Sequence, residues 1–228
     1  MIRAVSPKIE TPFLLEPNSV SVLIVENPHE YYQTVYELIK ASQGELSDFT
    51  FWQKEEQLSF SKMGDMVLNA FMLDLCDKKI ISLVIKKLQN NYQTGDYIVK
   101  LNTINSHVGC FLQELCQTVD FSLDFQELSL EDLLKISGIK PAVTYQTLLE
   151  KIICYINLYV ELKNTKLFVF IGLKDILTDE DLDLLYHHCA LQKVCLWLIE
   201  STKKRPSLPQ EKVVIITEDL CEIVENIP

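Results

Sequence analysis

The sequence has little glycine, and it lacks the glycine-rich motif that binds nucleotide phosphates. Only 6 of its 228 residues are glycine, and no segment has the spacing Gly-x-x-x-x-Gly-Lys followed by Ser or Thr. A phosphate-binding loop needs glycines to turn its backbone amides inward and a lysine to reach the terminal phosphates. No nucleophile-elbow sequence is present either. We therefore reject nucleotide hydrolysis and expect a protein that is not an enzyme.

Signals for export and membrane insertion are also missing. No apolar run reaches the roughly 18 residues needed to cross a bilayer. The N-terminus lacks the basic-then-apolar layout of a secretory signal. The seven cysteines include no Cys-x-x-Cys pair, which is typical of reduced thiols in a reducing compartment. We expect a soluble, cytoplasmic protein that makes no membrane contact.

Positive charge is in short supply. The formal net charge is −11, which argues against indiscriminate wrapping of nucleic acid. A local basic surface is still compatible with this net charge, because the local electrostatic field at a binding site determines whether DNA binds there. Lys203-Lys204-Arg205 lies in a loop, and the remaining candidates fall on one predicted helix: Lys78, Lys79, Lys86 and Lys87. A solvated helix face is the default meaning of such pairs, so a DNA surface requires an oligomer that brings several copies together.

Apolar runs predict an α/β domain. Residues 20–25, 166–171, 193–199 and 212–216 are nearly continuous apolar segments, as expected for strands of a parallel sheet covered on both faces. Residues 49–52 have the composition of a short strand, and residues 31–41 and 148–162 have helical stripes. The first strand leads into Glu26-Asn27-Pro28-His29-Glu30, which has no glycine. We predict a parallel-dominated sheet of about four or five strands, a head domain resembling a P-loop NTPase fold without the phosphate loop.

The middle of the chain predicts helices. From about residue 63 to residue 135 apolar residues recur at steps of three and four, with a long helix at about 96–116, a polar turn at 89–95, and a capping box at Ser129–Asp132. We assign residues 1–60 and 140–228 to the α/β head domain and residues 61–139 to an inserted α-helical leg domain.

An acidic segment follows the long helix. Asp120, Ser122, Asp124 and Gln126 recur at every second position, so an extended loop would place their oxygens on one side. Calcium prefers about six to eight oxygen ligands, whereas this window has only the carboxylates of Asp120, Asp124 and Glu127. A half-buried strand or turn with a solvated face explains the same pattern. His187-His188-Cys189 is not interpreted as a metal site, because adjacent helical residues rarely converge on one ion.

Several segments in order resemble a known family. They are the strand Val20–Glu26, the segment Asp120-x-x-x-Asp124 that leads into residues 133–139, and the C-terminal segments 166–171, 177–181 and 196–200. Their order and spacing are similar, over essentially the whole chain, to the CRISPR-associated Csn-two family of subtype II-A systems. That family acts in spacer acquisition, a step of antiviral defence.

The resemblance implies a non-catalytic, ring-shaped homotetramer that binds ends of double-stranded DNA in a lysine-lined hole and is stabilised by Ca²⁺. It also implies the CRISPR integrase pair and the RNA-guided effector nuclease as partners. The acidic loop of the family corresponds to Asp120, Asp124 and Glu127. Ser122 and Gln126 stand where the family is often acidic, so we expect weaker calcium binding. The DNA-facing lysines do not transfer residue by residue, and the lysines at 78, 79, 86 and 87 are chosen from this sequence.

Three hypotheses follow. The first is a DNA-end-binding accessory protein of CRISPR adaptation. The second is a protein-interaction scaffold of the adaptation complex with little DNA contact. The third, from a different class, is an enzyme that uses an unrecognised pocket in the head domain.

Overall fold

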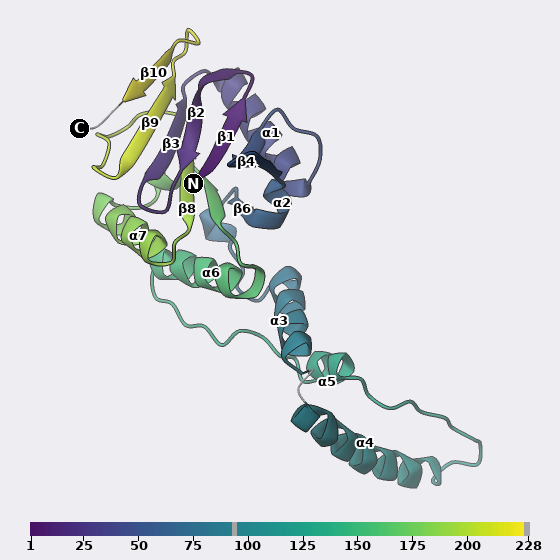
Figure 1. Ribbon diagram of the computed structural model, residues 1–228. Coiled ribbons are helices and arrows are strands. Elements are labelled where there is room, and N and C mark those ends of the chain that lie inside the picture. Colours follow the sequence, from purple (N-terminus) through teal and green to yellow (C-terminus); the bar gives the residue numbers. More distant parts are fainter. Residues whose placement is uncertain (93–94, 226–228) are drawn as a thin grey trace. The chain divides into compact units, whose positions relative to one another are not determined.

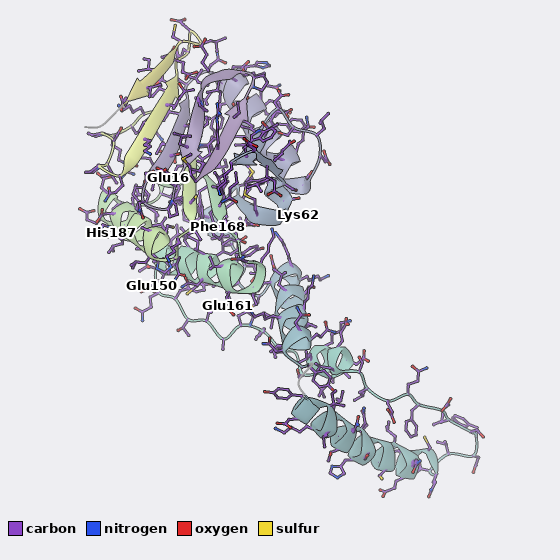
Figure 2. The ribbon with its side chains drawn as sticks, in the orientation of Figure 1. Glu16, Lys62, Glu150, Glu161, Phe168 and His187 are labelled. Carbon is purple, nitrogen blue, oxygen red and sulfur yellow. The ribbon has the colours of Figure 1, made fainter. Side chains whose placement is uncertain are left out.

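The computed structural model describes residues 1–92 and 95–225. The chain forms two compact units: Met1–Leu73 together with the chain from Thr144 onward, and Asp74–Val143 between them (Figure 1). Figure 2 adds the side chains. The sequence-based division differs at both boundaries, because it assigned residues 61–73 to the helical part and residues 140–143 to the α/β part.

The first unit contains a six-stranded sheet in the order β10-β9-β3-β8-β7-β6. Its strands are β3 (Val20–Val25), β6 (Gly64–Val67), β7 (Leu167–Ile171), β8 (Cys195–Glu200), β9 (Glu211–Ile216) and β10 (Glu222–Glu225). Neighbouring strands run parallel except for β9 and β10. Every residue of β3 and β8 is buried, as expected for strands covered on both faces. The prediction of an α/β fold with a parallel-dominated sheet is confirmed.

Strand β6 corrects the sequence-based assignment of residues after about Met63 to helices. Gly64 pairs with Leu167 and Val67 with Phe170, so this segment is an edge strand of the parallel sheet. A Cβ atom on Gly64 would lie 2.6 Å from the ring of Phe60, so the backbone approaches α2 (Phe60–Met63) closely. The periodicity was misleading because so short a strand offers too few positions for alternation to show.

A second, antiparallel sheet was only partly predicted. Its order is β2-β1-β4-β5, and its strands are β1 (Ile2–Ser6), β2 (Ile9–Leu15), β4 (Thr50–Gln53) and β5 (Glu56–Leu58). Only β4 was expected from the sequence. Trp197 of β8 is fully buried, and its ring centroid lies 4.8 Å from that of Phe13 and 5.6 Å from that of Phe49. A hydrophobic core cluster therefore lies between the two sheets.

Helices complete the first unit. They are α1 (Pro28–Gln43), α6 (Leu148–Lys163) and α7 (Asp179–Leu191), with the short turns η1 (Ala70–Met72) and η2 (Leu173–Asp175). The Tyr155 hydroxyl of α6 donates to Asp65 of β6 at 2.6 Å. The ring of Tyr159 lies edge-on to Phe168 of β7. These contacts attach α6 to the face of the parallel sheet opposite Trp197.

The second unit consists of α3 (Lys78–Asn91), α4 (Gly95–Cys116) and α5 (Leu130–Ile136). The predicted capping box of Ser129 and Asp132 begins α5. Asn105 of α4 holds the returning chain, because its side-chain amide donates to Leu128 O at 3.0 Å and accepts from Leu128 N at 3.1 Å. Helix α3 includes residues 89–91 of the expected turn, and positions 93–94 lie outside the described residues. Across residues 1–92 and 95–225, no helix is both long and apolar enough to cross a membrane.

Candidate functional site

The turn after β3 lies where a phosphate-binding loop would be, at the carboxyl end of a central parallel strand. The side chain of Asn27 caps α1, and its Oδ1 accepts from His29 N at 3.0 Å and from Glu30 N at 3.2 Å. Pro28 has no N–H, and Tyr31 N donates to Asn27 O at 2.9 Å. The N–H groups of this first turn are therefore paired within the chain, and none is left to face a phosphate.

Glu200 is a buried carboxyl group at the neighbouring strand end. It is the last residue of β8 and only 3% exposed, and its Oε1 accepts from Lys174 N at 2.9 Å. Burial raises the pKa of Glu200 to about 7. The hydrogen bond from Lys174 N lowers this pKa, and the charge of Asp175 raises it. Burial and then the charges of Glu200 and Asp175 raise the pKa of Tyr31 in α1. An ionised Glu200 is unfavourable for a phosphate ligand, and Lys174, Lys203, Lys204 and Arg205 line the same small pocket.

A buried ion pair lies on the α7 side of the same sheet. Lys174 Nζ donates to both carboxylate oxygens of Glu211, at 2.7 and 2.6 Å, and the Tyr186 hydroxyl donates to Glu211 Oε1 at 2.7 Å. Glu211 is 2% exposed. Burial and then the charge of Glu211 raise the pKa of Tyr186. These groups satisfy one another, which indicates a structural role.

Sequence reasoning missed Lys174, Glu200 and Glu211. One signal was available: both glutamates directly border apolar strand segments, where a charged residue needs a partner.

The basic cluster Lys203-Lys204-Arg205 is neutralised by carboxylates. Lys203 pairs with Glu225, Lys204 with Asp175 at 2.8 Å, and Arg205 with Asp179 at 2.6 Å. Arg205 also donates to the carbonyl oxygens of Lys174 and Leu177. This loop therefore binds its own unit and does not present a cationic surface.

Helix α3 carries the four lysines that were predicted to contact DNA. Lys78, Lys79 and Lys86 are exposed, and Lys87 is partly buried. Lys79 and Lys86 share one helical face, and Lys78 and Lys87 lie about 90° to either side of it. The sequence of α3 contains no acidic residue. This helix is thus a concentration of positive charge in an acidic chain.

Asp120, Asp124 and Glu127 lie exposed on the loop between α4 and α5. Asp124 Oδ1 accepts from the adjacent Phe125 N at 2.9 Å. Among the described residues, no three His, Cys, Asp or Glu side chains are close enough together to hold a metal ion. Within one copy of the chain these carboxylates lie apart, and a calcium ion requires more oxygen ligands than one carboxylate supplies. Calcium binding at this loop stays a prediction.

Helix α4 and the loop after it expose many apolar side chains. No residue between 96 and 127 is buried. The large exposed apolar residues are Tyr97, Ile98, Val99, Ile104, Phe111, Leu115, Val119, Phe121, Leu123 and Phe125. A groove of about 350 Å³ runs between helix and loop and includes Val108 and Leu112. So many exposed large apolar side chains in one segment indicate an interaction site.

The histidines and cysteines do not converge on a shared centre. His187 Nδ1 lies 3.1 Å from Asp183 O, and His188 Nε2 lies 2.8 Å from Asn157 Oδ1. Burial lowers the pKa of His188. Cys195 is buried in β8, and burial raises its pKa to about 11. A thiol with so high a pKa is a core residue and a poor nucleophile, as the sequence predicted.

The fold and these sites define an α/β protein with a mostly parallel sheet, in which Asn27 caps the helix that follows the central strand β3. The sequence matches the family described as CRISPR-associated protein (Cas_Csn2) over residues 42–220. The chain belongs to this family, so it is a CRISPR-associated protein. The expected resemblance is confirmed.

Three solved structures are similar to the chain at low sequence identity. A nucleotide-free ATP-binding cassette from an ABC transporter is 8% identical, with a TM-score of 0.48, over 99% of this chain and 92% of that one. The ADP conformation of another such cassette is 9% identical, with a TM-score of 0.47, over 99% and 91%. A putative ABC transporter ATP-binding protein from Pyrococcus furiosus is 10% identical, with a TM-score of 0.42, over 93% and 96%. No curated protein sequence matches the chain.

Proposed function

We propose that this chain is a non-catalytic accessory protein of CRISPR spacer acquisition that binds ends of double-stranded DNA as a ring-shaped homotetramer. Its further partners would be the integrase pair and the RNA-guided effector nuclease. One observation carries the DNA contact: α3 has four lysines and no acidic residue, in a chain of net charge −11. Binding to phosphates needs such local clustering of lysine, and it is independent of base sequence.

The closed turn after β3 supports a role without nucleotide chemistry. Asn27 occupies the amides of His29 and Glu30, and the buried Glu200 contributes negative charge nearby. A nucleotide triphosphate would have to displace the cap and overcome this charge. The parallel sheet would then serve as a rigid platform for assembly.

The apolar surface of α4 and its return loop supports self-association. A second copy that covers Phe111, Leu115 and Phe121 would remove large side chains from water, and each apolar Å² buried contributes roughly 25 cal/mol. Closed symmetry would repeat α3 around one axis. The lysines of several copies would then add their fields at one duplex, which overcomes the unfavourable net charge of a single chain.

Gel-shift assays with linear and relaxed circular duplexes, with and without Ca²⁺, test the proposal. We expect the linear duplex to bind preferentially and binding to weaken steeply with salt. The double variant Lys78→Gln/Lys86→Gln should lower the slope of log K against log salt by about two, since each lost phosphate contact removes about one. Lys62→Gln, an exposed lysine of α2, is the matched control and should behave as wild type.

Two results would contradict the proposal. Failure on both duplexes at low salt would eliminate DNA binding and favour the scaffold hypothesis. Wild-type affinity and salt slope in the double variant would show that α3 is not the DNA surface.

A further inference from the structure

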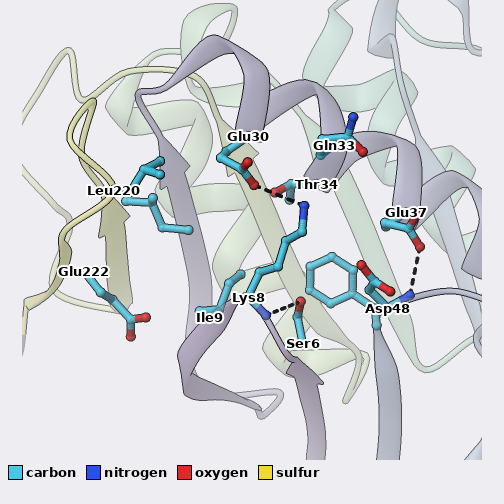
Figure 3. A pocket seen from close by; sticks show the side chains of 12 residues that line it. Ser6, Lys8, Ile9, Glu30, Gln33, Thr34, Glu37, Asp48, Leu220 and Glu222 are labelled. Atoms are coloured by element: carbon cyan, nitrogen blue, oxygen red, sulfur yellow. Dashed lines mark hydrogen bonds and ion pairs between the residues drawn. The ribbon is translucent and has the colours of Figure 1, made fainter.

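A cavity of about 280 Å³ lies in the first unit beside the first part of α1, and its lining includes Glu30 at the end of the turn after β3 (Figure 3). Its walls come from four places in the sequence: the β1–β2 hairpin, α1, the segment before β4, and the end of β9 with the turn that follows. Ile9, Phe49 and Ile216 supply apolar surface. Nothing in the proposed DNA-binding function uses this cavity.

Carboxylates dominate its charged lining. The acidic residues are Glu30, Glu37, Asp48 and Glu222, and Lys8 is the one basic residue. Two of the four are compensated: Lys8 Nζ lies 3.3 Å from Glu30 Oε2, and Lys40 Nζ lies 2.8 Å from Glu37 Oε1.

The other two carboxylates, Asp48 and Glu222, form no ion pair within the described residues. Glu222 accepts two uncharged donors, Glu10 N and Thr11 N, both at 2.8 Å. The Asp48 carboxylate accepts no hydrogen bond from the described part of the chain. The cavity therefore has two carboxylates without a direct ion-pair partner, and the nearby Lys40 interacts with Asp48 only through its charge.

Two buried hydroxyl groups also line the cavity. Thr34 is 8% exposed, and its hydroxyl forms no hydrogen bond with any described residue. Ser6 is 4% exposed, and its Oγ accepts only a long contact of 3.4 Å from Lys8 N. Both hydroxyl groups line the cavity and have unused acceptor capacity, so each can accept a hydrogen bond from a ligand.

We propose that this cavity binds a small aliphatic cation with two ammonium groups, of the class of short diamines and polyamines. Asp48 and Glu222 would each bind one ammonium group, and the hydroxyls of Ser6 and Thr34 would accept further N–H bonds. The methylene chain would lie on the apolar surface of the cavity. A metal ion is a poor fit, because Asp48 and Glu222 lie on opposite sides of Lys8 (Figure 3) and no three potential ligands cluster among the described residues.

Isothermal titration calorimetry of the full chain, without DNA, tests the proposal with putrescine, cadaverine and spermidine as probes. Butylamine and MgCl₂ are the controls for charge number and ionic strength. We expect saturable binding of at least one diamine probe and much weaker binding of both controls. Asp48→Asn should weaken binding about tenfold, equivalent to about 1.4 kcal/mol. Glu56→Gln, an exposed acid on β5 outside the cavity, should leave it unchanged.

Two further variants separate a ligand site from general charge screening. Lys8→Met removes the competing ammonium group and should strengthen binding, whereas Thr34→Val keeps the shape, removes the hydroxyl and should weaken it. Equal heats from MgCl₂ and putrescine, or wild-type affinity in Asp48→Asn, would overturn the proposal. Because the assay contains no DNA, Lys78→Gln/Lys86→Gln should bind the probe normally, which keeps this inference distinguishable from the DNA function.

Discussion

Replacement of Glu200 by glutamine is expected to stabilise the first unit at alkaline pH and to leave its stability unchanged in acid. Glutamine has nearly the same shape, and its carbonyl oxygen can accept the Lys174 N–H as the carboxylate does. Glutamine carries no charge, so it avoids the cost of burying an ionised carboxylate, and it is this cost that raises the pKa of Glu200 to about 7. The substitution therefore removes one ionisation and little else.

The sign and size follow from the pKa of the folded and unfolded chains. The ordinary pKa of a glutamate side chain is 4.5. Below pH 4.5 Glu200 is therefore protonated in both the folded and the unfolded chain, and its burial causes no loss of stability. As pH rises from 4.5 to about 7, the unfolded chain ionises while the folded chain keeps its proton, so the free energy of unfolding falls until the folded pKa is passed. At about 1.4 kcal/mol per pH unit of pKa difference, the full loss is about 3 kcal/mol. Glu200→Gln should therefore be up to about 3 kcal/mol more stable than wild type at pH 8.

Urea unfolding followed by tryptophan fluorescence measures this difference. Both tryptophans of the chain, Trp52 and Trp197, lie in the first unit, so the signal reports on the unit that contains Glu200. Wild type, Glu200→Gln and the exposed control Glu56→Gln would be compared at several pH values from 4 to 8. A variant that is less stable than wild type at pH 8, or a difference that does not grow with pH, would refute the reasoning.

Three other predictions follow. Lys174→Met should lower the free energy of unfolding by about 3–5 kcal/mol, because it leaves the buried Glu211 carboxylate without its cation. The double variant Lys174→Met/Glu211→Met should recover most of this loss in the same urea assay. A single variant as stable as wild type would contradict this prediction. Asn27→Ala should lower the free energy of unfolding by about 1 kcal/mol, because α1 loses its N-terminal cap. Calorimetric titration of wild type with ATP and Mg²⁺ should release no heat of binding. Asp124→Ala should reduce the tetramer fraction in Ca²⁺, and an unchanged fraction by sedimentation would remove that loop as a calcium site.

The inner strands of the parallel sheet were predictable because they are almost entirely apolar, whereas β6 and β10 at its two edges are not and were missed. Val20–Val25 and Leu167–Ile171 show the pattern of doubly covered strands without reference to any partner. The antiparallel sheet was less visible, since β1 and β2 mix buried residues with exposed Arg3 and Glu10, and β5 has only three residues.

The candidate sites differ in the same way: features set by local sequence were predictable, and contacts between distant residues were not. The closed turn at residues 26–30 was evident from its lack of glycine, because helix capping is local. The contacts of Lys174 with Glu200 and Glu211 join residues 26 and 37 positions apart, and no local pattern specifies such a pairing. Residues 120–127 are all exposed, so the expected half-buried strand or turn is not present, and the alternation did not determine whether the carboxylates converge.

The Glu222 carboxylate has a consequence for solubility. Strand β2 is the outer strand of its sheet, and an outer strand presents backbone donors with which another chain can pair. Glu222 occupies two of these donors, Glu10 N and Thr11 N. It thereby leaves an intruding strand less to bind at this end of the sheet. Deletion of β10 would leave the main core in place and still open a route to aggregation of the folded protein.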